Sequence, residues 1–286
     1  MKEETHNEYQ KSLNRTIDFI NNNLHTEINL NDLSRIAHIS EYHFHRIFKA
    51  FIGEPIGRYL IRLRMEKAAQ LLRFSDATLA DIAEKTGYQS PFSLSKAFKK
   101  HFGITPSAFR NLETFFSSKM ISKKSETSVK LTPKIRRIDP IELVYIRIID
   151  QYGAEEAYHR AWKKLIDYVK KMKLFSRQNE YIGLSYDDPN ITQAEKCRFY
   201  ACISIDKPIT PFGEFGSIRI EGGKFAVFQL RGSYAKLESF YQNIYYDWLP
   251  MSGYDLRNSM GFEKYLNHPD KVKESEILTE VYIPIK

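Results

Sequence analysis

The sequence is poor in cysteine and contains no long hydrophobic run. Its two cysteines, Cys197 and Cys202, are too few for a disulfide framework or a four-cysteine zinc site. No stretch approaches the roughly 18 consecutive apolar residues of a membrane span, and the polar N-terminus lacks the apolar core of a secretion signal. These absences exclude an integral membrane protein, and we expect a cytoplasmic protein without a membrane partner.

Glycine and proline are not enriched either. With 13 glycines and 11 prolines, the chain is neither collagen-like nor a low-complexity disordered protein. The sequence also lacks the phosphate-binding Walker pattern, the dinucleotide-binding GxGxxG pattern and the zinc-binding HExxH pattern. We therefore predict no cofactor, no metal site and no catalytic residue. The 286 residues, of which 42% are hydrophobic, suit two domains that each bury a core.

Positive charge and tyrosine are distributed unevenly along the chain. Lysine and arginine number 43 against 35 aspartates and glutamates, a net charge of +8. Residues 1–128 carry +5, with their basic residues in short runs, whereas residues 129–286 carry +3 and hold 14 of the 18 tyrosines. A basic balance makes nucleic acid a candidate partner of the first part. The two parts differ chemically, and we expect them to have different functions.

A polar, serine-rich stretch divides the chain. Residues 117–128 show no apolar period, which is typical of an exposed linker. Before this stretch, apolar residues recur at helical spacing, and after it valine, isoleucine and tyrosine alternate as they do in strands. We therefore predict a multidomain protein, with an all-α domain over 1–116, a linker over 117–128 and an α+β domain over 129–286.

The first domain contains an internal repeat. The pattern of residues 30–53 returns over residues 79–103. Each copy predicts a short helix, a tight turn and a second helix that begins after a serine, Ser40 in one copy and Ser90 in the other. A serine hydroxyl at this position can accept a hydrogen bond from the first helical turn. The pattern is that of two helix-turn-helix units.

A long helix predicted over residues 56–73 connects the two units. Its length of roughly 27 Å is close to the ~34 Å that separates major-groove faces on one side of DNA. The first turn contains His38 where the second contains Gly87, so the first unit matches the pattern less well. A plain helical bundle with a charged surface would explain one unit. Two units in register, each with basic residues on its second helix, favour DNA binding.

These residues resemble the AraC/XylS family of bacterial transcription regulators. The resemblance covers roughly residues 14–112 and is carried by residues 33–48, 53–72 and, most specifically, 82–110. It implies seven helices and a nucleoid-associated regulator that contacts two adjacent major-groove segments of double-stranded promoter DNA and can bend the DNA between them. RNA polymerase is a further candidate partner.

The resemblance also places the residues that read DNA bases. They fall on Tyr42, His45 and Arg46 in the first unit and on Phe92, Ser93 and Lys96 in the second. Arginine can contact guanine through two hydrogen bonds, an aromatic ring can pack on a thymine methyl group, and lysine can reach guanine or phosphate. The alternative for each residue is a phosphate contact or solvent exposure. For Phe92 a contact with the connecting helix is a further alternative.

The second domain is predicted as two ββαββ-like units. The first unit has strands over 129–138 and 143–149, a helix over 154–173, and strands over 181–186 and 198–205. The second has strands over 217–220 and 224–230, a helix over 234–249, and strands over 261–266 and 277–283. An offset of 79 residues places Trp162 on Tyr241 and Tyr200 on Thr279. This duplication predicts a pseudo-twofold α+β domain with a groove where the units meet.

The second domain resembles the GyrI-like domain, which binds small molecules. The resemblance is carried by residues 181–189, 222–227, 232–234, 248–254, 262–267 and 278–284. It implies a central pocket lined with aromatic residues, which in many relatives receives amphipathic cations. A buried glutamate provides the counter-charge in that pocket, and by motif this glutamate is Glu263.

The chemistry of the residues is consistent with such a pocket. A carboxylate on a strand beside aromatic residues is partly desolvated, and a bound cation would relieve that cost. The candidate aromatic residues for cation–π attraction are Trp248, Tyr145, Tyr186, Tyr234 and Tyr265. In the alternative interpretation, Glu263 pairs with a lysine or arginine on the surface and the tyrosines are half-buried sheet residues.

We therefore interpret the chain as a sequence-specific DNA-binding transcription regulator. Its second domain is expected to bind a small lipophilic or cationic effector, as in multidrug sensing. Two alternatives stay open. Glu263 could act as the general base of a hydrolase if burial raised its pKa, or the second domain could serve only for contacts with other proteins. Cys197 and Cys202 are expected to be small buried strand residues and not a redox pair.

Overall fold

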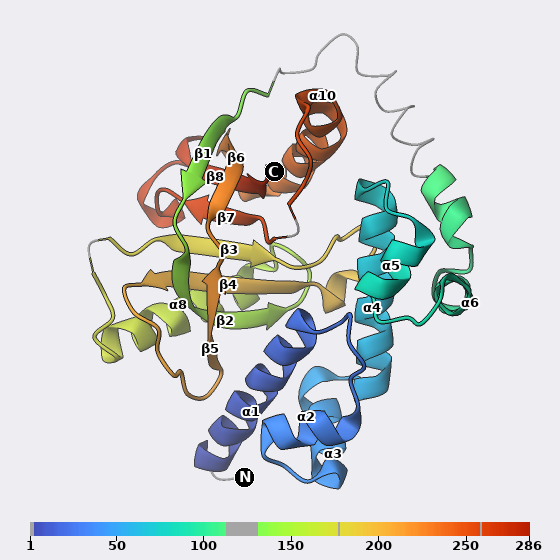
Figure 1. Ribbon diagram of the computed structural model, residues 1–286. Helices are drawn as coiled ribbons and strands as arrows, with labels where there is room; N and C mark the ends of the chain where they lie inside the picture. The colour runs from blue at the N-terminus through green and yellow to red at the C-terminus, as the bar shows by residue number, and fades with distance from the viewer. Residues whose placement is uncertain (1–2, 113–130, 177, 258) are drawn as a thin grey trace. The chain divides into compact units, whose positions relative to one another are not determined.

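The computed structural model describes residues 3–112, 131–176, 178–257 and 259–286, which form two compact units. The first unit is helical, and the second is built on a single antiparallel sheet (Figure 1). The predicted fold class, an all-α region followed by an α+β region, is confirmed. The predicted linker, residues 117–128, lies outside the described residues, and the domain bounds 1–116 and 129–286 stay predictions.

The first unit contains the two predicted helix-turn-helix pairs. Its helices are α1 (Glu3–Asn22), α2 (Leu30–Ala37), α3 (Glu41–Ile52), α4 (Ile56–Phe74), α5 (Leu79–Lys85) and α6 (Pro91–Phe102), and residues 106–112 are also helical. Helices α2 and α3 form the first pair, and α5 and α6 form the second. Helix α4 is the predicted connection and has 19 residues, or a length of about 28 Å. The pairs lie toward opposite ends of α4 (Figure 1).

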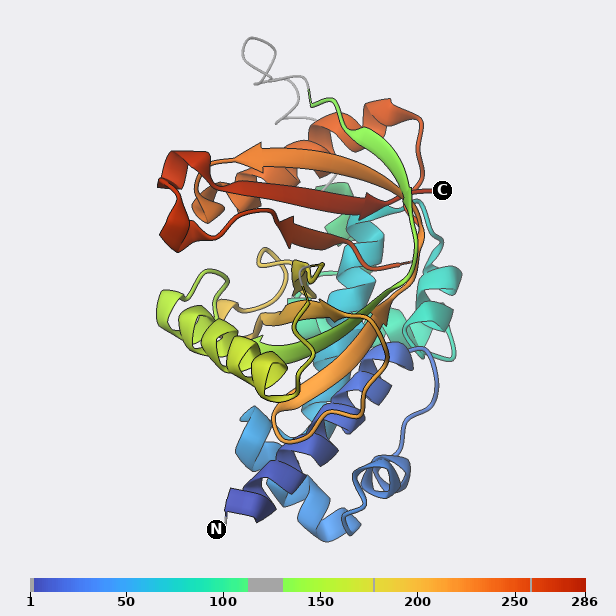
Figure 2. The same cartoon turned by 90° about the vertical axis from the view of Figure 1, so that its left-hand side faces the viewer.

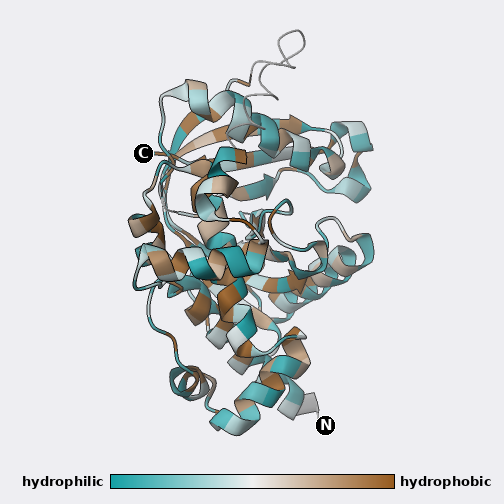
Figure 3. Ribbon diagram, turned by 90° about the vertical axis from the view of Figure 1, so that its right-hand side faces the viewer, coloured by the Kyte–Doolittle hydropathy of each residue, from teal (hydrophilic) through white to brown (hydrophobic). Residues whose placement is uncertain are grey.

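Each helix of the first unit buries one apolar face. In α3 the buried side chains are Phe44 and Phe48, and in α6 they are Leu94 and Phe98 at the equivalent positions. Hydrophobic and hydrophilic residues accordingly alternate around these helices (Figure 3). Helix α1 was not predicted from the apolar spacing, because it has few apolar residues, but Ile17 is buried in the same core as α2 and α3. The opposite faces of α3 and α6 are exposed.

The turn of each helix-turn-helix pair contains one residue in the left-handed backbone conformation, and the residue type differs between the two turns. His38 has φ +55° and Gly87 has φ +71°. Glycine adopts this conformation without strain, whereas a residue with a side chain is disfavoured. A Cβ atom on Gly87 would also lie 2.6 Å from the carbonyl oxygen of Leu24. The histidine noted in the sequence therefore occupies a glycine-type conformation.

The second helices of the two pairs, α3 and α6, begin differently. The Ser90 side chain accepts a hydrogen bond from the backbone N–H of Ser93, which confirms the predicted cap of α6. Ser40 is the N-cap residue of α3, but its side chain makes no capping hydrogen bond, so this part of the prediction is wrong. The two serines differ in φ, −59° for Ser40 and −158° for Ser90, and the side chain of Ser40 is consequently aimed elsewhere.

The second unit is an eight-stranded antiparallel sheet with the order β1-β6-β8-β7-β3-β4-β2-β5. The first four strands are β1 (Lys134–Ile138), β2 (Ile141–Ile149), β3 (Tyr181–Ser185) and β4 (Arg198–Ile205). The last four are β5 (Phe215–Ile220), β6 (Gly223–Arg231), β7 (Phe262–Tyr265) and β8 (Leu278–Pro284). Strands β3 and β7 are neighbours at the centre, and the two edge strands are exchanged between the copies: β1 pairs with β6 and β5 pairs with β2. This order confirms the predicted duplication.

In the strand pairs β3–β4 and β7–β8, the two copies are related by an offset one residue longer than predicted. Asp187 in the first copy and Asn267 in the second each accept a hydrogen bond from a backbone N–H at the start of the following strand, at 2.6 and 3.0 Å. These equivalent residues are 80 positions apart, so Tyr200 corresponds to Glu280 and not to Thr279. The predicted register is wrong because a shift of one residue moves a strand side chain to the other face.

Helices cover one face of the sheet. Helix α8 (Glu155–Lys171) packs on β2 and β4 (Figure 2), and α9 (Leu237–Gln242) packs on β6 and β8 on the same face. The predicted continuous helix over 234–249 is composite: a 3-10 turn over Tyr234–Lys236, α9, a π-helical segment over Asn243–Trp248 and α10 (Leu249–Ser252). Pro250, which has no N–H to donate, is the second residue after the π-helical segment. The opposite face has its own apolar cluster around Tyr200.

Candidate functional site

The exposed face of α3 contains all three residues of the first helix-turn-helix pair that are predicted to read DNA. Tyr42, His45 and Arg46 lie opposite the buried Phe44 and Phe48, because residues on one helical face recur every three to four positions. The Arg46 Nη1 atom donates a hydrogen bond of 3.0 Å to the Tyr42 hydroxyl, and the guanidinium lies 5.6 Å from the centre of the Tyr42 ring. Tyr42 thus holds the arginine in a defined orientation.

Helix α6 exposes a different set of groups. Phe92 is 78% exposed, and Lys96 is exposed one turn later, followed by Lys99 and Lys100. The Ser93 hydroxyl is engaged in the helix cap: it accepts a hydrogen bond from the Ser90 backbone N–H at 3.2 Å and donates one to the Ser90 carbonyl at 2.8 Å. The structure therefore brings Phe92 and Lys96 to the surface together, while Ser93 stabilises the start of the helix.

The connecting helix is fixed by buried charges. Arg62 donates to Glu54 at 2.5 Å and to Glu66 at 3.2 Å, and all three side chains are largely buried. These carboxylates raise the pKa of Arg62, although burial acts against the charge. Arg64 donates to the backbone carbonyls of Leu24 and Thr26, which joins α4 to the segment before α2. These contacts fix α4 to the turn that follows α3 and to the segment that precedes α2.

Glu263 is a buried carboxylate on β7 at the centre of the sheet, with 3% of its surface exposed. It accepts three hydrogen bonds: from the Tyr265 hydroxyl at 2.6 Å, from the Tyr241 hydroxyl at 3.1 Å and from the Ser185 hydroxyl at 3.2 Å. The three donors come from β7, α9 and β3. Elements from both copies of the duplicated unit therefore meet at this carboxylate.

No basic side chain in the described part of the chain forms an ion pair with Glu263. Burial raises the pKa of Glu263 above its usual 4.5, and the three hydroxyl donors act in the opposite direction. Burial, with a further contribution from the charge of Glu263, raises the pKa of Tyr234 to about 12 and that of Tyr241 well above 10. The alternative in which Glu263 pairs with a surface base is thus wrong. The site is a desolvated carboxylate surrounded by neutral tyrosines.

Aromatic rings form the walls around Glu263. Tyr265 meets Tyr234 edge to face with ring centres 5.4 Å apart, and it meets Trp162 of α8 in the same way at 5.9 Å. The pKa of Tyr158, one turn earlier on α8, is raised by burial and by the charge of Glu263. Residues on α8, on α9 and at the 3-10 turn thus surround the carboxylate with π-electron faces and edges.

The duplication explains how one carboxylate fits at the centre. Gly183 on β3 is the residue equivalent to Glu263, and the two are paired in the β3–β7 ladder. A Cβ atom on Gly183 would lie 2.3 Å from the Tyr265 hydroxyl and 2.8 Å from the Phe199 ring. The first copy therefore leaves the space that the second copy fills with Glu263 and Tyr265.

The structure separates two of the remaining predicted effector residues from Glu263. Tyr145 stacks on Tyr200, and Tyr186 packs on Tyr200 at a tilt, with ring centres 4.4 and 4.3 Å apart, on the opposite face of the sheet. Their predicted grouping with Glu263 is wrong, because alternate strand residues face opposite sides. Trp248 packs edge to face on Phe228 at 4.9 Å, in the apolar core of β6, β8 and α9 on the same face as Glu263, and its place in the effector site stays a prediction.

Sequence reasoning missed several residues at the site. Tyr241, Ser185, Trp162 and Tyr158 were not among the predicted effector contacts. The internal repeat contains a signal for two of them, because it aligns Trp162 with Tyr241 on the two helices that flank the pseudo-twofold axis. Residues aligned in this way face the same central region from either side.

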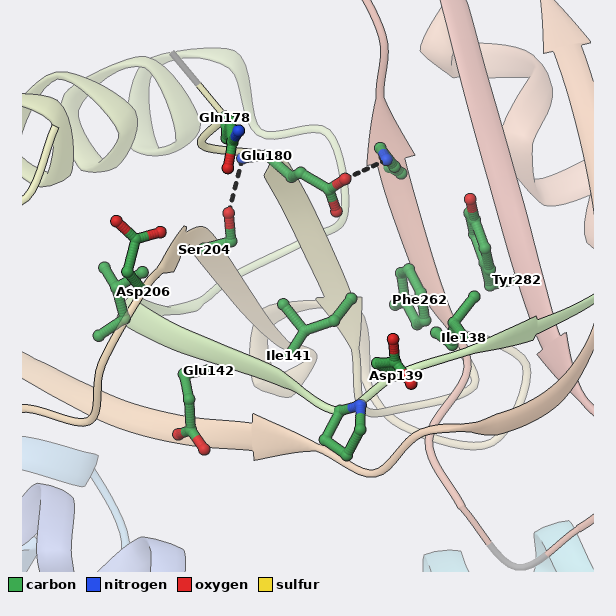
Figure 4. Close-up of a pocket in the computed structure, with 13 residues that line it drawn as sticks. Ile138, Asp139, Ile141, Glu142, Gln178, Glu180, Ser204, Asp206, Phe262 and Tyr282 are labelled. Carbon is green, nitrogen blue, oxygen red and sulfur yellow. Dashed lines mark hydrogen bonds and ion pairs between the residues drawn. The ribbon is translucent and has the colours of Figure 1, made fainter. Parts of the chain in front are cut away.

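A hollow of about 380 Å³ lies on the other face of the sheet (Figure 4). Phe262 and Tyr282 line it together with several carboxylates, of which Glu180 forms an ion pair with Lys264. Glu263 does not line this hollow, since its neighbours Phe262 and Lys264 on β7 point to that side instead. The buried, unpaired carboxylate and the open hollow are therefore separate features.

Other site types find little support among the described residues. No three histidine, cysteine, aspartate or glutamate side chains there come together in a way that could hold a metal ion. Cys197 and Cys202 are both buried, and no disulfide joins them. None of the helices in the described ranges combines the length and the apolar character needed to cross a lipid bilayer.

Comparison with known proteins gives matches to both units. A family described as the GyrI-like small molecule binding domain matches residues 131–286, and a helix-turn-helix domain family matches residues 33–112. The F1 operon positive regulatory protein of Yersinia pestis is 23% identical over 96% of this chain and 89% of that protein. The lactose operon transcription activator of Staphylococcus xylosus is 34% identical over 35% of this chain and 36% of that protein.

A Bacillus subtilis protein described as the uncharacterized HTH-type transcriptional regulator YbfP is 31% identical over 43% of this chain and 41% of that protein. The matches to the S. xylosus and B. subtilis proteins thus span about two fifths of those relatives. Among solved structures, the EcmrR–DNA complex has a TM-score of 0.49 at 14% identity, with coverage of 90% of this chain and 98% of that chain. The AdpA DNA-binding domain in complex with a target DNA has a TM-score of 0.34 at 24% identity, with coverage of 40% and 97%.

Proposed function

The chain belongs to the AraC-type helix-turn-helix proteins that carry a GyrI-like small molecule binding domain, and on this premise we propose that it is a transcription regulator controlled by a small cation. The first unit binds promoter DNA through α3 and α6. The second unit binds a lipophilic cation next to Glu263. The observation that carries the effector proposal is a buried carboxylate with three hydroxyl donors and no basic partner in the described ranges.

DNA binding is supported by the exposed faces of the two reading helices. In a helix-turn-helix the second helix lies in the major groove, and residues near its N-terminus meet the base edges. Arg46, oriented by Tyr42, can donate two hydrogen bonds to the O6 and N7 atoms of guanine. Lys96 and the following lysines of α6 add phosphate contacts, which strengthen binding to any sequence.

Arg46→Ala tests the base-reading role. We expect the variant to lose about 1–3 kcal/mol more binding free energy on a preferred site than on random DNA, measured by fluorescence anisotropy at fixed salt. Arg160→Ala, which removes an exposed arginine of α8, is the matched control for net charge. An equal loss on both DNAs would remove Arg46 from base recognition and leave it as a phosphate contact.

Effector binding follows from the electrostatics of Glu263. Burial without a counter-charge costs free energy, and a cation placed beside the carboxylate would recover part of that cost. The tyrosine and tryptophan rings around it attract a cation through their faces. An apolar cation that fits between α8 and α9 satisfies both interactions, whereas a hydrophilic or anionic molecule satisfies neither.

Tetraphenylphosphonium, with the neutral triphenylphosphine oxide as control, tests this proposal. Because a ligand that binds the native state stabilises it, the cation should raise the unfolding temperature and the neutral compound should not. Glu263→Gln should weaken cation binding about tenfold or more while DNA binding stays unchanged. Tyr241→Phe removes one hydrogen bond but keeps the charge, and it should bind the cation. Unchanged cation affinity in Glu263→Gln would exclude the carboxylate as the counter-charge.

The same protein and cations distinguish two further candidate roles of the second unit. A carboxyl group with a raised pKa next to the Tyr241 hydroxyl is also a possible general base for hydrolysis. Mass spectrometry after incubation distinguishes turnover from binding, because a sensor returns its ligand unchanged. A unit used only for contact with other proteins, such as RNA polymerase, would show no thermal shift with any member of a cation panel.

A further inference from the structure

The two reading helices offer different chemistry to DNA. Helix α3 presents an oriented arginine, a tyrosine hydroxyl and the His45 imidazole, all of which are groups that can hydrogen-bond to base edges. The first turn of α6 presents none of these. Pro91 has no backbone N–H, and the hydroxyls of Ser90 and Ser93 are joined to each other and to the backbone in the capping box.

Phe92 is the large side chain that the first turn of α6 leaves available. It is 78% exposed, although Phe98 on the same helix is fully buried. None of the ring contacts in the described part of the chain involves Phe92, and most of its surface faces solvent. A phenyl ring held in water on a basic helix gains free energy when it is buried against another apolar group.

The apolar group that base edges present in the major groove is the C5-methyl group of thymine. Resting on the proposed DNA-binding function, we infer that the second helix-turn-helix pair selects thymine by packing Phe92 on its methyl group, whereas the first pair selects bases by hydrogen bonds. Lys96 lies one turn further along and contributes charge. The two halves of the binding site are therefore read by two different physical interactions.

The test replaces thymine by uracil, which pairs identically and lacks only the methyl group. Full-length protein is first used to select a preferred duplex from random sequences, and each thymine of that duplex is then replaced in turn by deoxyuridine. We expect one or two replacements, all in one half-site, to weaken binding about three- to fivefold, the loss that corresponds to one buried methyl group. Replacements in the other half-site should have no such effect.

Phe92→Ala connects the effect to the ring. This variant should bind the thymine and uracil duplexes equally, with an unchanged salt dependence, because no charge has been removed. Arg46→Ala should keep the thymine preference in that half-site, and Phe175→Ala, at an exposed phenylalanine of the second unit, should keep it as well. The substituted side chain is exposed, so thermal unfolding of Phe92→Ala should match that of the parent protein.

Three results would overturn the inference, and they are distinguishable. Equal binding of all uracil duplexes by the parent protein would show that no methyl group is read. A thymine preference retained in Phe92→Ala would assign the reading to another residue. Failure to select any preferred duplex would refute the proposed DNA-binding function itself, and the thymine inference with it.

Discussion

Glu263 and Gly183 show how a duplicated unit acquires a single asymmetric site. The two residues are equivalent by sequence and are paired across the central strands. Because they lie so close to the pseudo-twofold axis, two glutamates there would place like charges side by side in a buried region, which is strongly unfavourable. A glycine in one copy and a glutamate in the other avoid this repulsion and leave room for the hydroxyl of Tyr265.

The pH dependence of stability follows from Glu263. Burial raises its pKa in the folded protein, whereas an unfolded chain titrates near pH 4.3. The native state therefore binds the proton more strongly, and its stability falls as the pH rises from the unfolded pKa through the folded one. We expect Glu263→Gln to be more stable than the parent at pH 7, with the difference vanishing below about pH 4.

Urea unfolding between pH 4 and pH 7 measures this difference, and Glu156→Gln, an exposed carboxylate of α8, is the control for charge. If the stability gain of Glu263→Gln were the same at both ends of this range, the cause would be packing and not ionisation. The same titration predicts that cation affinity rises with pH, since only the carboxylate form provides the counter-charge.

His38 and Gly87 are a second pair of equivalent residues, and we expect their substitution to change stability in opposite directions. A side chain in the left-handed region costs about 1–2 kcal/mol, and the greater freedom of glycine in the unfolded chain offsets part of that. We expect His38→Gly to stabilise the first unit by about 0.5–1 kcal/mol. Gly87→Ala should destabilise it by about 2 kcal/mol or more, because strain is combined with the close approach to the Leu24 carbonyl. Urea unfolding of both variants checks the signs, and destabilisation by His38→Gly would contradict the assigned strain.

At the scale of the helix, α3 and α6 differ in how they begin. Helix α6 has a complete capping box, and α3 has a serine at the N-cap position without a side-chain hydrogen bond. A cap satisfies backbone N–H groups that the first turn otherwise leaves without partners. The N-terminal turn of α6 is thus more firmly held than that of α3.

Matched serine substitutions test this difference. We expect Ser90→Ala to cost about 0.5–2 kcal/mol of stability, the usual value for loss of a capping side chain, and Ser40→Ala to cost little. Denaturant unfolding gives both values under the same conditions. Equal costs at the two positions would show that Ser40 caps α3 in solution after all.

At the scale of the whole molecule, each of the two proposed activities belongs to a unit with its own hydrophobic core. The helical unit buries its own cluster around Phe44 and Tyr59, and the sheet unit buries clusters on both of its faces. A ligand in one unit can change DNA binding by the other only if it binds the two states of the protein with different affinity. Regulation by the proposed effector therefore requires a coupling between the two units.

Separate fragments test this independence. We expect residues 1–116 to bind DNA, with an affinity that falls steeply as salt rises, and residues 129–286 to unfold cooperatively and to bind tetraphenylphosphonium. Full-length protein with and without the cation then measures the coupling itself. A fragment that fails to fold alone would show that its core depends on the other unit.

Local sequence patterns are enough to predict the elements and their repetition. Helical and strand periods are set by neighbouring residues, so α2 to α6 and all eight strands were predicted close to their observed positions, together with the helix-turn-helix pairs and the duplication. The sequence also identified Glu263, through a motif. Tertiary structure alone decided which side chains surround that carboxylate: it brought in Tyr241 and Ser185 and moved Tyr145 and Tyr186 to the other face. The reason is physical, since strand register joins residues about 80 positions apart, and a shift of one residue exchanges the faces without changing the local pattern.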